Sequence, residues 1–359
     1  MKQGWEIKKI KDICNKASSN IAQNKIVELD GDYPVFGASG FVQNIDFYHR
    51  DKRYIGVVKD GSGVGRVNIY PPYSSLLGTL QYILPNDGYD LDFVAYALKR
   101  VNLPKFSSGA AIPHIYFRDY GEVEIAVPSL DEQKRIVEIL DREFEKIDTL
   151  KANAEKGLQY AKDLFQSALK QELQPKEGWT TKTIGELSED LFAGGDVPRE
   201  SFSKTQNDDY NIPIYANAVE NNGLYGYTNR ARVIKPSITI AGRGSGTGYV
   251  IERNESYFPV VRLIVVIPNE FVLNKYLYYA LKALNIKSNG SAIPQLTVPM
   301  IAQYKINFPK SLDEQNTIIC LLDRISEYCK TLQANYEKTI ALCDDMKQAL
   351  LRKAFNGEF

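Results

Sequence analysis

The chain carries an internal duplication, and this repeat limits the fold more than any other feature of the sequence. Gly4-Trp5 at the start is matched by Gly178-Trp179, 174 residues later. Five more segments recur in the same order, at offsets up to 183: Pro34-Val35-Phe36 with Pro213-Ile214-Tyr215, Gly61-Ser62-Gly63-Val64-Gly65 with Gly244-Ser245-Gly246-Thr247-Gly248, Tyr96-Ala97-Leu98-Lys99 with Tyr279-Ala280-Leu281-Lys282, Ala111-Ile112-Pro113 with Ala292-Ile293-Pro294, and Ser129-Leu130-Asp131-Glu132-Gln133 with Ser311-Leu312-Asp313-Glu314-Gln315. Such self-similarity predicts two copies of one structural unit.

The first part of each copy, residues 1–128 and 175–309, has the pattern of a strand-rich domain. Short runs of Tyr, Phe, Val and Ile alternate there with Gly, Pro and Asn, which is typical of strands and turns. We expect one short helix in each domain. These helices are predicted from Asp90 to Val101, with Asp90 as the N-cap, and from Asn274 to Leu284, with Asn274 as the N-cap.

The second part of each copy, residues 129–174 and 310–359, has the pattern of one long helix. Apolar residues recur there at alternating steps of three and four, as in the seam of a packed helix. In the first helix these residues are Ile136, Leu140, Phe144, Ile147, Leu150, Ala154, Leu158, Ala161, Phe165 and Ala168. In the second they are Ile318, Leu322, Ile325, Cys329, Leu332, Tyr336, Ile340, Cys343, Met346 and Leu350.

The ends of the two long helices are also signalled. Capping boxes formed by Ser129 with Glu132 and by Ser311 with Glu314 predict the starts, while Pro175 and Gly357 mark the ends. At about 1.5 Å per residue, each helix would be roughly 60 Å long. An apolar seam of that length needs a partner, and the other long helix is the nearest candidate. The expected fold is therefore α+β: two similar strand-rich domains separated by two long antiparallel helices packed as a coiled coil.

Composition excludes several classes of protein. The 359 residues contain 44 basic and 44 acidic side chains, and 44% are hydrophobic. The longest apolar runs fall far short of the roughly 18 residues that a membrane span needs, and the N-terminus has no apolar signal core. Four separated cysteines and two histidines favour neither a disulfide framework nor a metal site. We expect a cytoplasmic protein without a cofactor.

The order of these segments resembles the specificity subunit of type I restriction–modification systems. The resemblance covers the whole chain and is carried by the two Gly-Trp openings, the paired Leu-Asp-Glu-Gln segments, the Ala-Ile-Pro turns and the terminal run from Leu350 to Glu358. It implies a non-catalytic DNA reader in which each domain recognises one half of a split, asymmetric site and the helices set the spacer. It also implies three kinds of partner: double-stranded DNA, two methyltransferase subunits docked on the helices, and restriction (translocase) subunits.

Two glycine-rich loops are candidates for DNA contact. We expect strands at 54–58 and 66–70 to flank the loop 59–65, and strands at 237–241 and 249–252 to flank the loop 242–248. A nucleotide-binding loop leads from a strand into a helix, so these loops do not fit that function. They are either plain hairpin turns or small-residue loops that approach DNA. The candidate contact residues are Lys59, Ser62, Gly63, Arg66, Arg243, Ser245 and Thr247.

A second pair of loops surrounds the Ala-Ile-Pro turns. Their hydroxyl, amide and cationic side chains suit phosphates and base edges, although turn chemistry explains the glycines and prolines equally well. The candidate residues are Lys105, Ser107, Ser108, His114, Lys287, Ser288, Asn289, Ser291 and Gln295. His114 is matched by Gln295, which cannot titrate, so a general base at this position is disfavoured.

Asn217 and Asn221 are further candidates for base contact, although asparagine is also a common turn residue. Tyr70-Pro71-Pro72-Tyr73 is similar to the Asn-Pro-Pro-Tyr motif of amino-methyltransferases, but Tyr70 replaces the polar residue that would hold the target amine. We therefore expect no methyl transfer by this chain alone.

The charge balance leaves one alternative open. Residues 1–128 carry 15 basic and 14 acidic side chains, and residues 175–309 carry 14 and 12. A protein that bound many phosphates alone would be more basic. We interpret the near-neutral charge of the two domains to mean that partner subunits help to neutralise the DNA phosphates. A duplicated coiled-coil scaffold that binds only proteins is the alternative, and an enzyme is disfavoured because the two repeats share no catalytic constellation.

Overall fold

The computed structural model describes residues 4–109, 112–244, 246–284, 286 and 295–359. The chain divides into two compact units: unit 1 comprises residues 1–155 and 337–359, and unit 2 comprises residues 156–336. Two long helices, α4 (Leu130–Glu172) and α7 (Leu312–Phe355), each contribute to both units. We call the strands and short helices of unit 1 module 1, and those of unit 2 module 2.

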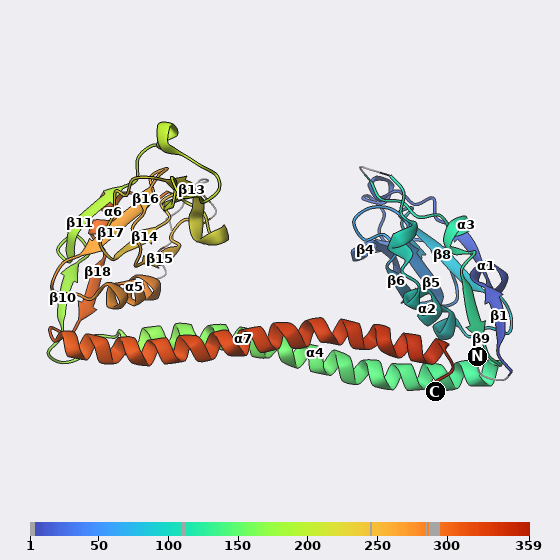
Figure 1. Ribbon diagram of the computed structural model, residues 1–359. Helices are drawn as coiled ribbons and strands as arrows, with labels where there is room; N and C mark the ends of the chain where they lie inside the picture. Colours follow the sequence, from blue (N-terminus) through green and yellow to red (C-terminus); the bar gives the residue numbers. More distant parts are fainter. Residues whose placement is uncertain (1–3, 110–111, 245, 285, 287–294) are drawn as a thin grey trace. The chain divides into compact units, whose positions relative to one another are not determined.

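Module 1 is built from short strands and one longer helix, α2 (Figure 1). Its strands are β1 (Glu6–Lys9), β2 (Cys14–Ser18), β3 (Tyr33–Gly37), β4 (Gly40–Ile45), β5 (Tyr54–Val58), β6 (Val67–Tyr70), β7 (Ser75–Leu76), β8 (Leu80–Pro85) and β9 (Glu124–Val127). Its helices are α1 (Ile10–Ile13), η1 (Gln23–Lys25), α2 (Leu91–Arg100), η2 (Leu103–Phe106) and α3 (Phe117–Tyr120).

Module 2 repeats this composition. Its strands are β10 (Thr180–Thr183), β11 (Ser188–Ala193), β12 (Ile212–Tyr215), β13 (Leu224–Thr228), β14 (Ser237–Ile240), β15 (Val250–Arg253), β16 (Phe258–Pro259), β17 (Ile264–Pro268) and β18 (Lys305–Phe308). Its helices are η3 (Arg199–Ser201), η4 (Glu220–Gly223), α5 (Asn274–Ala283) and α6 (Val298–Ala302).

The sheets of the two modules have the same topology. Module 1 orders its described strands as β1-β9, β2-β8-β5-β6 and β4-β3-β7, and module 2 orders them as β10-β18, β11-β17-β14-β15 and β13-β12-β16. Even the one parallel pairing in each, β3 with β7 and β12 with β16, recurs. The predicted duplication and the α+β class are confirmed.

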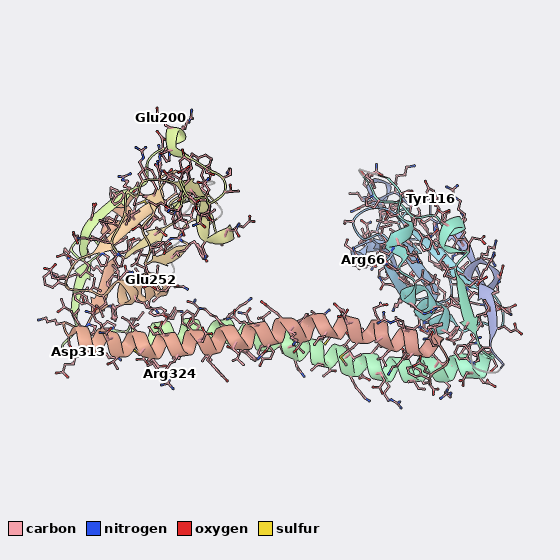
Figure 2. The ribbon with its side chains drawn as sticks, viewed as in Figure 1. Arg66, Tyr116, Glu200, Glu252, Asp313 and Arg324 are labelled. Atoms are coloured by element: carbon pink, nitrogen blue, oxygen red, sulfur yellow. The ribbon has the colours of Figure 1, made fainter. Side chains whose placement is uncertain are left out.

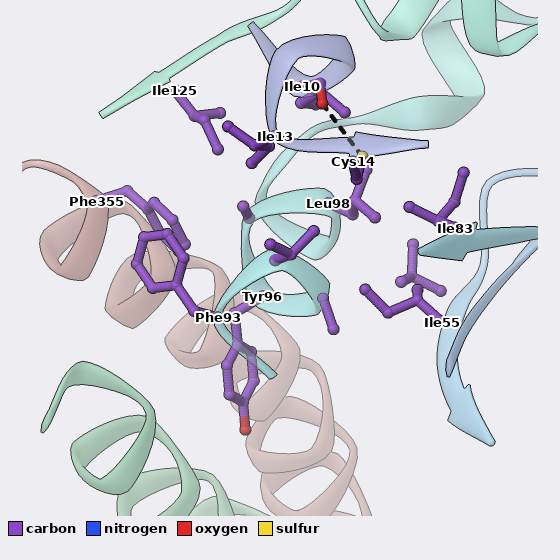
Figure 3. Packing of buried hydrophobic residues seen from close by; sticks show 14 of the residues in the cluster. Ile10, Ile13, Cys14, Ile55, Ile83, Phe93, Tyr96, Leu98, Ile125 and Phe355 are labelled. Carbon is purple, nitrogen blue, oxygen red and sulfur yellow. Dashed lines mark hydrogen bonds between the residues drawn. The ribbon is translucent and has the colours of Figure 1, made fainter. Parts of the chain in front are cut away.

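In unit 1, α2 lies between the four-stranded sheet and the long helices. Phe93 of α2 packs against Phe355 of α7, with ring centroids 4.9 Å apart (Figure 3). The same core takes Ile83 from β8 and Leu140 from α4. The core of unit 2 is built the same way, because α5 packs with Leu169 of α4 and Leu322 of α7. The long helices are thus part of each module's hydrophobic core.

The two long helices run antiparallel, as predicted. In unit 1, Lys151 Nζ donates to Asp344 Oδ1 (2.9 Å), and Lys347 pairs with Asp148. In unit 2, a side chain on Gly157 would collide with the ring of Tyr336, so this glycine lets the two helices approach closely. Along α4 the buried seam includes residues spaced by seven, namely Leu140, Ile147, Ala154 and Ala161. This spacing is that of a coiled coil.

Two seam positions differ from the prediction. Leu150 is 44% exposed and Met346 is 45% exposed, and together with Ile147, Ala349 and Leu350 they line a hollow of about 390 Å³ on the helices of unit 1. Two packed helices bury only a narrow stripe of each, so apolar residues that flank the stripe remain at the surface. The spacing of apolar residues by three and four positions did not distinguish the buried residues of the seam from the exposed apolar residues beside it.

One of the two predicted N-caps is wrong. Asp90 caps α2, and its Oδ1 accepts a hydrogen bond from Phe93 N–H (2.9 Å). Asn274 is instead the first residue of α5. The N-cap of α5 is Leu273, whose apolar side chain cannot accept a hydrogen bond. The main-chain N–H of Leu273 donates to Gln315 Oε1 (2.8 Å), so a distant side chain replaces the local cap.

The repeated Leu-Asp-Glu-Gln segments have a structural role. Gln133 and Gln315 are buried polar side chains in the first turns of α4 and α7. Gln133 accepts from Asp90 N–H (2.9 Å) and donates to Pro128 O (2.9 Å). Gln315 makes the equivalent bonds and also donates to Phe271 O (2.9 Å). Each glutamine therefore ties the start of a long helix to the start of the short helix of its module.

The neighbouring glutamates extend this connection. Glu314 N–H donates to Ser311 Oγ (3.4 Å), which is one half of the predicted capping box, and the Glu314 carboxylate accepts from Trp179 Nε1 (2.9 Å). In α4 the Glu132 carboxylate pairs with Arg135. The Gly-Trp opening and the Leu-Asp-Glu-Gln segment of the second copy are thus held together by a direct bond.

We predict that Gln315→Met lowers the free energy of unfolding of unit 2 by about 3 kcal/mol, because one buried and two partly buried main-chain groups lose their partner. Urea unfolding followed by the fluorescence of Trp179, in a Trp5→Phe background, reports on this unit. The matched control is Gln166→Met, an exposed position on α4 that should change the midpoint little. Equal midpoints for the two variants would contradict the structural role of Gln315.

Candidate nucleic-acid interface

In module 1 the two predicted loops form one site. The glycine loop 59–65 joins β5 to β6, as predicted, and residues 113–115 run beside it. Gly61 N–H donates to Pro113 O (2.9 Å), and Ile115 N–H donates to Lys59 O (3.0 Å). Segments that lie some 50 residues apart in the sequence are thereby fixed together by main-chain hydrogen bonds.

Asp60 is the centre of a polar cluster at this junction. It bonds His114 Nδ1 through one oxygen and Lys59 Nζ through the other, the latter at 2.5 Å. Burial opposes ionisation of Asp60, but the bonds from Lys59 and His114 outweigh it, so the pKa of this carboxyl lies below its ordinary value of 3.8. Asp60 is therefore a carboxylate at neutral pH, with lone pairs that can accept further hydrogen bonds.

Of the remaining candidates of module 1, Gly63 is buried and the others lie at the surface. Arg66 lies at the surface (Figure 2) with its guanidinium against Gly63, where a larger residue would collide with it. The exposed candidates are Ser62, Lys105, Ser107 and Ser108. Ser108 also exchanges main-chain hydrogen bonds with His114 (both 2.9 Å), which closes its loop. The structure thus brings the module 1 candidates to the two loops of one site.

Sequence analysis missed two side chains beside this site. The ring of Tyr116 lies 4.1 Å from that of His114, and the Arg118 guanidinium lies 4.5 Å from the Tyr116 ring. Tyr116 precedes the short helix α3 and Arg118 lies in it, so no simple sequence period signals that the three side chains meet. Tyr116 is 41% exposed (Figure 2), and an exposed aromatic beside a cation is a common feature of nucleic-acid surfaces.

In module 2 the described parts of the two loops also meet. The loop 242–248 joins β14 to β15, as predicted, and Leu296 N–H donates to Gly242 O (2.8 Å). Arg243 and Gln295 form a main-chain bridge, and both side chains are exposed. The candidates Ser245, Lys287, Ser288, Asn289 and Ser291 lie outside the described residues.

The side chains of Asn217 and Thr247 bond to the main chain, whereas Asn221 is exposed. Asn217 Oδ1 accepts from Gly242 N–H (2.8 Å), and its Nδ2 donates to Val261 O. Asn217 thus positions the glycine loop. Asn221 has a left-handed backbone (φ 47°), as expected for a turn asparagine, and Thr247 Oγ1 donates to Gly244 O (2.6 Å). These bonds fix the shape of the loop.

Equivalent positions of the two sites differ in their side chains but share their backbone. The bridge between Asp60 and His114 in module 1 corresponds to the bridge between Arg243 and Gln295 in module 2. Gly61 and Gly65 have φ values of 87°, and their counterparts Gly244 and Gly248 have φ values of 90° and 88°. One scaffold therefore presents an acidic group in one module and a basic group in the other.

The described part of the chain contains neither a cluster of metal ligands nor a membrane-spanning helix. His, Cys, Asp and Glu side chains do not gather there in groups that could hold a metal ion. The described helices also include none that is both long and apolar enough to cross a membrane.

Comparison with known proteins identifies the family. The family described as the type I restriction modification DNA specificity domain matches twice, over residues 2–159 and 176–341. The chain belongs to this family of type I specificity subunits. The double match covers both copies of the repeat found in the sequence, and the resemblance stated above is confirmed.

Relatives and solved structures agree with this assignment. Two Mycoplasma pneumoniae proteins described as type I specificity subunits are 31% identical over 75% of this chain and 82% of the relative, and 30% identical over 88% and 87%. One solved structure, described as the structural basis of complex assembly and conformational transition of the type I R-M system, contains a chain with the same fold. Its TM-score is 0.81, with 17% identity over 100% of this chain and 99% of that chain. The protein is a DNA sequence-specificity subunit, and the scaffold alternative is not favoured.

The left-handed glycines of the loops give a prediction. Added to Gly248, a Cβ atom would lie 1.9 Å from Ile286 O, whereas at Gly244 it would meet nothing within 4 Å. Because both have a left-handed backbone, Gly244→Ala should cost about 1 kcal/mol of stability, and Gly248→Ala about 3 kcal/mol or more. Thermal unfolding of the two variants checks this, and equal losses would show that the close approach in module 2 is absent.

Proposed function

We propose that this specificity subunit reads a bipartite DNA site without catalysing any reaction itself. One recognition domain, residues 1–128, reads one half of an asymmetric site, and a second, residues 175–309, reads the other. The long helical segments, residues 129–174 and 310–359, set the length of the spacer between the halves.

The observation that carries this proposal is the pair of matched loop sites. In both modules a main-chain bridge joins the glycine loop to the second segment, yet Asp60 and His114 of module 1 are replaced by Arg243 and Gln295 in module 2. A carboxylate can accept from the amino group of cytosine, whereas a guanidinium donates to guanine. Two sites with one backbone and opposite charges should therefore recognise two different short sequences.

The same comparison supports a subunit without an active site. Catalysis in both halves would need the same acid–base pair in both, and the Asp60–His114 pair is not repeated. The modification chemistry is then supplied by partner subunits, and the candidate residues of the loops contribute DNA contacts only.

Methyltransferase subunits are the proposed partners of the long helices. Leu150 and Met346 lie half-exposed beside Ile147 in the hollow of unit 1, and an exposed apolar patch of this kind is typical of protein interfaces. The near-neutral charge of the chain fits a complex in which partners neutralise most of the phosphates. Restriction subunits would join this assembly, and the relative solved within a type I system supports an assembled complex.

An exchange of one domain tests the proposal. Residues 1–128 are replaced by the corresponding part of the Mycoplasma pneumoniae relative that is 30% identical, and the chain is expressed with its methyltransferase. Methylation sequencing should then show one half of the recognised site changed and the other half intact, because each module reads its half independently.

The reciprocal exchange, of residues 175–309, is the matched control and should change only the other half. A change in both halves after a single exchange would contradict the modular reading. Methyl transfer by the purified chain alone, given a methyl donor, would contradict the proposal that it has no active site.

A further inference from the structure

A turn in module 2 has an unusual backbone. In the segment 260–263, Leu263 N–H donates to Val260 O (3.1 Å), which closes a four-residue turn. The two central residues, Val261 and Arg262, have φ values of 52° and 59°. Two successive positive φ angles define a type I′ turn, which glycine, asparagine and aspartate dominate. A β-branched residue such as valine is strained there.

The surrounding structure holds this turn in place. Val261 N–H donates to Gly195 O (2.8 Å), and Arg262 N–H donates to Gly194 O (3.0 Å). Val261 O accepts from the side chain of Asn217, whose other end holds the glycine loop at Gly242. Strained residues persist when neighbouring groups determine their conformation, and such residues cluster at functional sites.

The other copy of the repeat shows that the fold itself does not require this strain. The equivalent turn of module 1, the segment 77–80, lies 183 residues earlier and is closed by the same bond, from Leu80 N–H to Leu77 O (2.9 Å). Its central residues are Gly78 and Thr79, and neither has a positive φ. The mirror-image turn is therefore specific to module 2, where it redirects the two side chains.

The turn displays a cation beside the predicted loop site. Arg262 is exposed, and its guanidinium has no hydrogen bond or ion pair with a described residue. The carbonyl oxygen of Arg262 lies 3.2 Å from the position that a Cβ atom of Gly242 would take, so the turn adjoins the loop of Arg243. Arg243 is likewise exposed, and the structure gives its side chain no partner among described residues. Two guanidinium groups without carboxylate partners among the described residues thus lie on adjacent segments.

We propose that Arg262 reads a guanine in the half-site recognised by module 2, next to the contact made by Arg243. The guanidinium fork can donate two hydrogen bonds to O6 and N7 of guanine, which is the commonest specific contact in the major groove. A phosphate contact would tolerate a flexible side chain on an ordinary turn, whereas a base contact requires a fixed direction. This inference rests on the proposed function, because it assigns a base to one of the two half-sites.

Three variants of the chain, each in complex with its methyltransferase, test the proposal on a library of DNA sites with randomised halves. Arg262→Ala removes the fork, Arg262→Lys keeps the charge without the fork, and Val261→Gly removes the strained side chain while Arg262 remains. Methylation sequencing gives the base preference at each position. Thermal unfolding confirms that each variant is folded, as expected for exposed side chains.

We expect Arg262→Ala and Arg262→Lys to reduce the preference for guanine at one position of one half-site, from on the order of 10-fold to 100-fold down to about 2-fold. The other half-site should not change, and Val261→Gly should retain the preference. Full preference for guanine in Arg262→Ala, or weaker methylation of all sequences alike in that variant, would show that Arg262 does not read the base and overturn the proposal. A wild-type complex without a bipartite site would instead contradict the proposed function itself.

Discussion

The apolar seam between α4 and α7 is the constraint on which the rest of the structure depends. Neither helix can expose such a stripe to water, so each packs along the other in antiparallel register, with Leu140 and Ile147 among the buried residues. Each compact unit consequently contains one strand-rich module and a stretch of both helices.

The module cores are continuous with this seam. Phe355 of α7 packs against Phe93 of α2, and Leu169 of α4 packs in the core of unit 2. Gln133 and Gln315 then fix the first turn of each long helix to its module. A rigid junction of this kind would transmit the length of the helix pair to the positions of the loops, as a spacer element requires.

The fold was largely predictable from the sequence, because its signals are local or repeated. The matched segments indicated two modules, Asp90 signalled the start of α2, and the glycine loops were correctly placed between paired strands. The Asn274 cap was wrong because Gln315, 42 residues away, supplies the bond that a local cap would make. Leu150 could not be separated from the seam, because periodicity alone does not show how wide the buried stripe is.

The candidate site was less predictable, because its chemistry depends on contacts between distant segments. Nothing in the local sequence indicates that Asp60 meets His114, or that Asn217 holds both the glycine loop and the turn at Val261. A Val-Arg pair in a type I′ turn contradicts the usual turn signals, and hydrogen bonds with Gly194, Gly195 and Asn217 hold it there. Rules that relate a residue type to its local conformation are expected to fail at functional or strained sites, and this turn is such a site.

The most direct test of the account lengthens the paired helices. Seven residues that continue the heptad pattern are inserted after Glu155 in α4 and after Tyr336 in α7, which extends the pair by about 10 Å while keeping the seam in register. Methylation sequencing of the complex should then show both recognised half-sites unchanged and the spacer between them longer, by up to about three base pairs. An unchanged spacer between intact half-sites would contradict the claim that the helices set the distance.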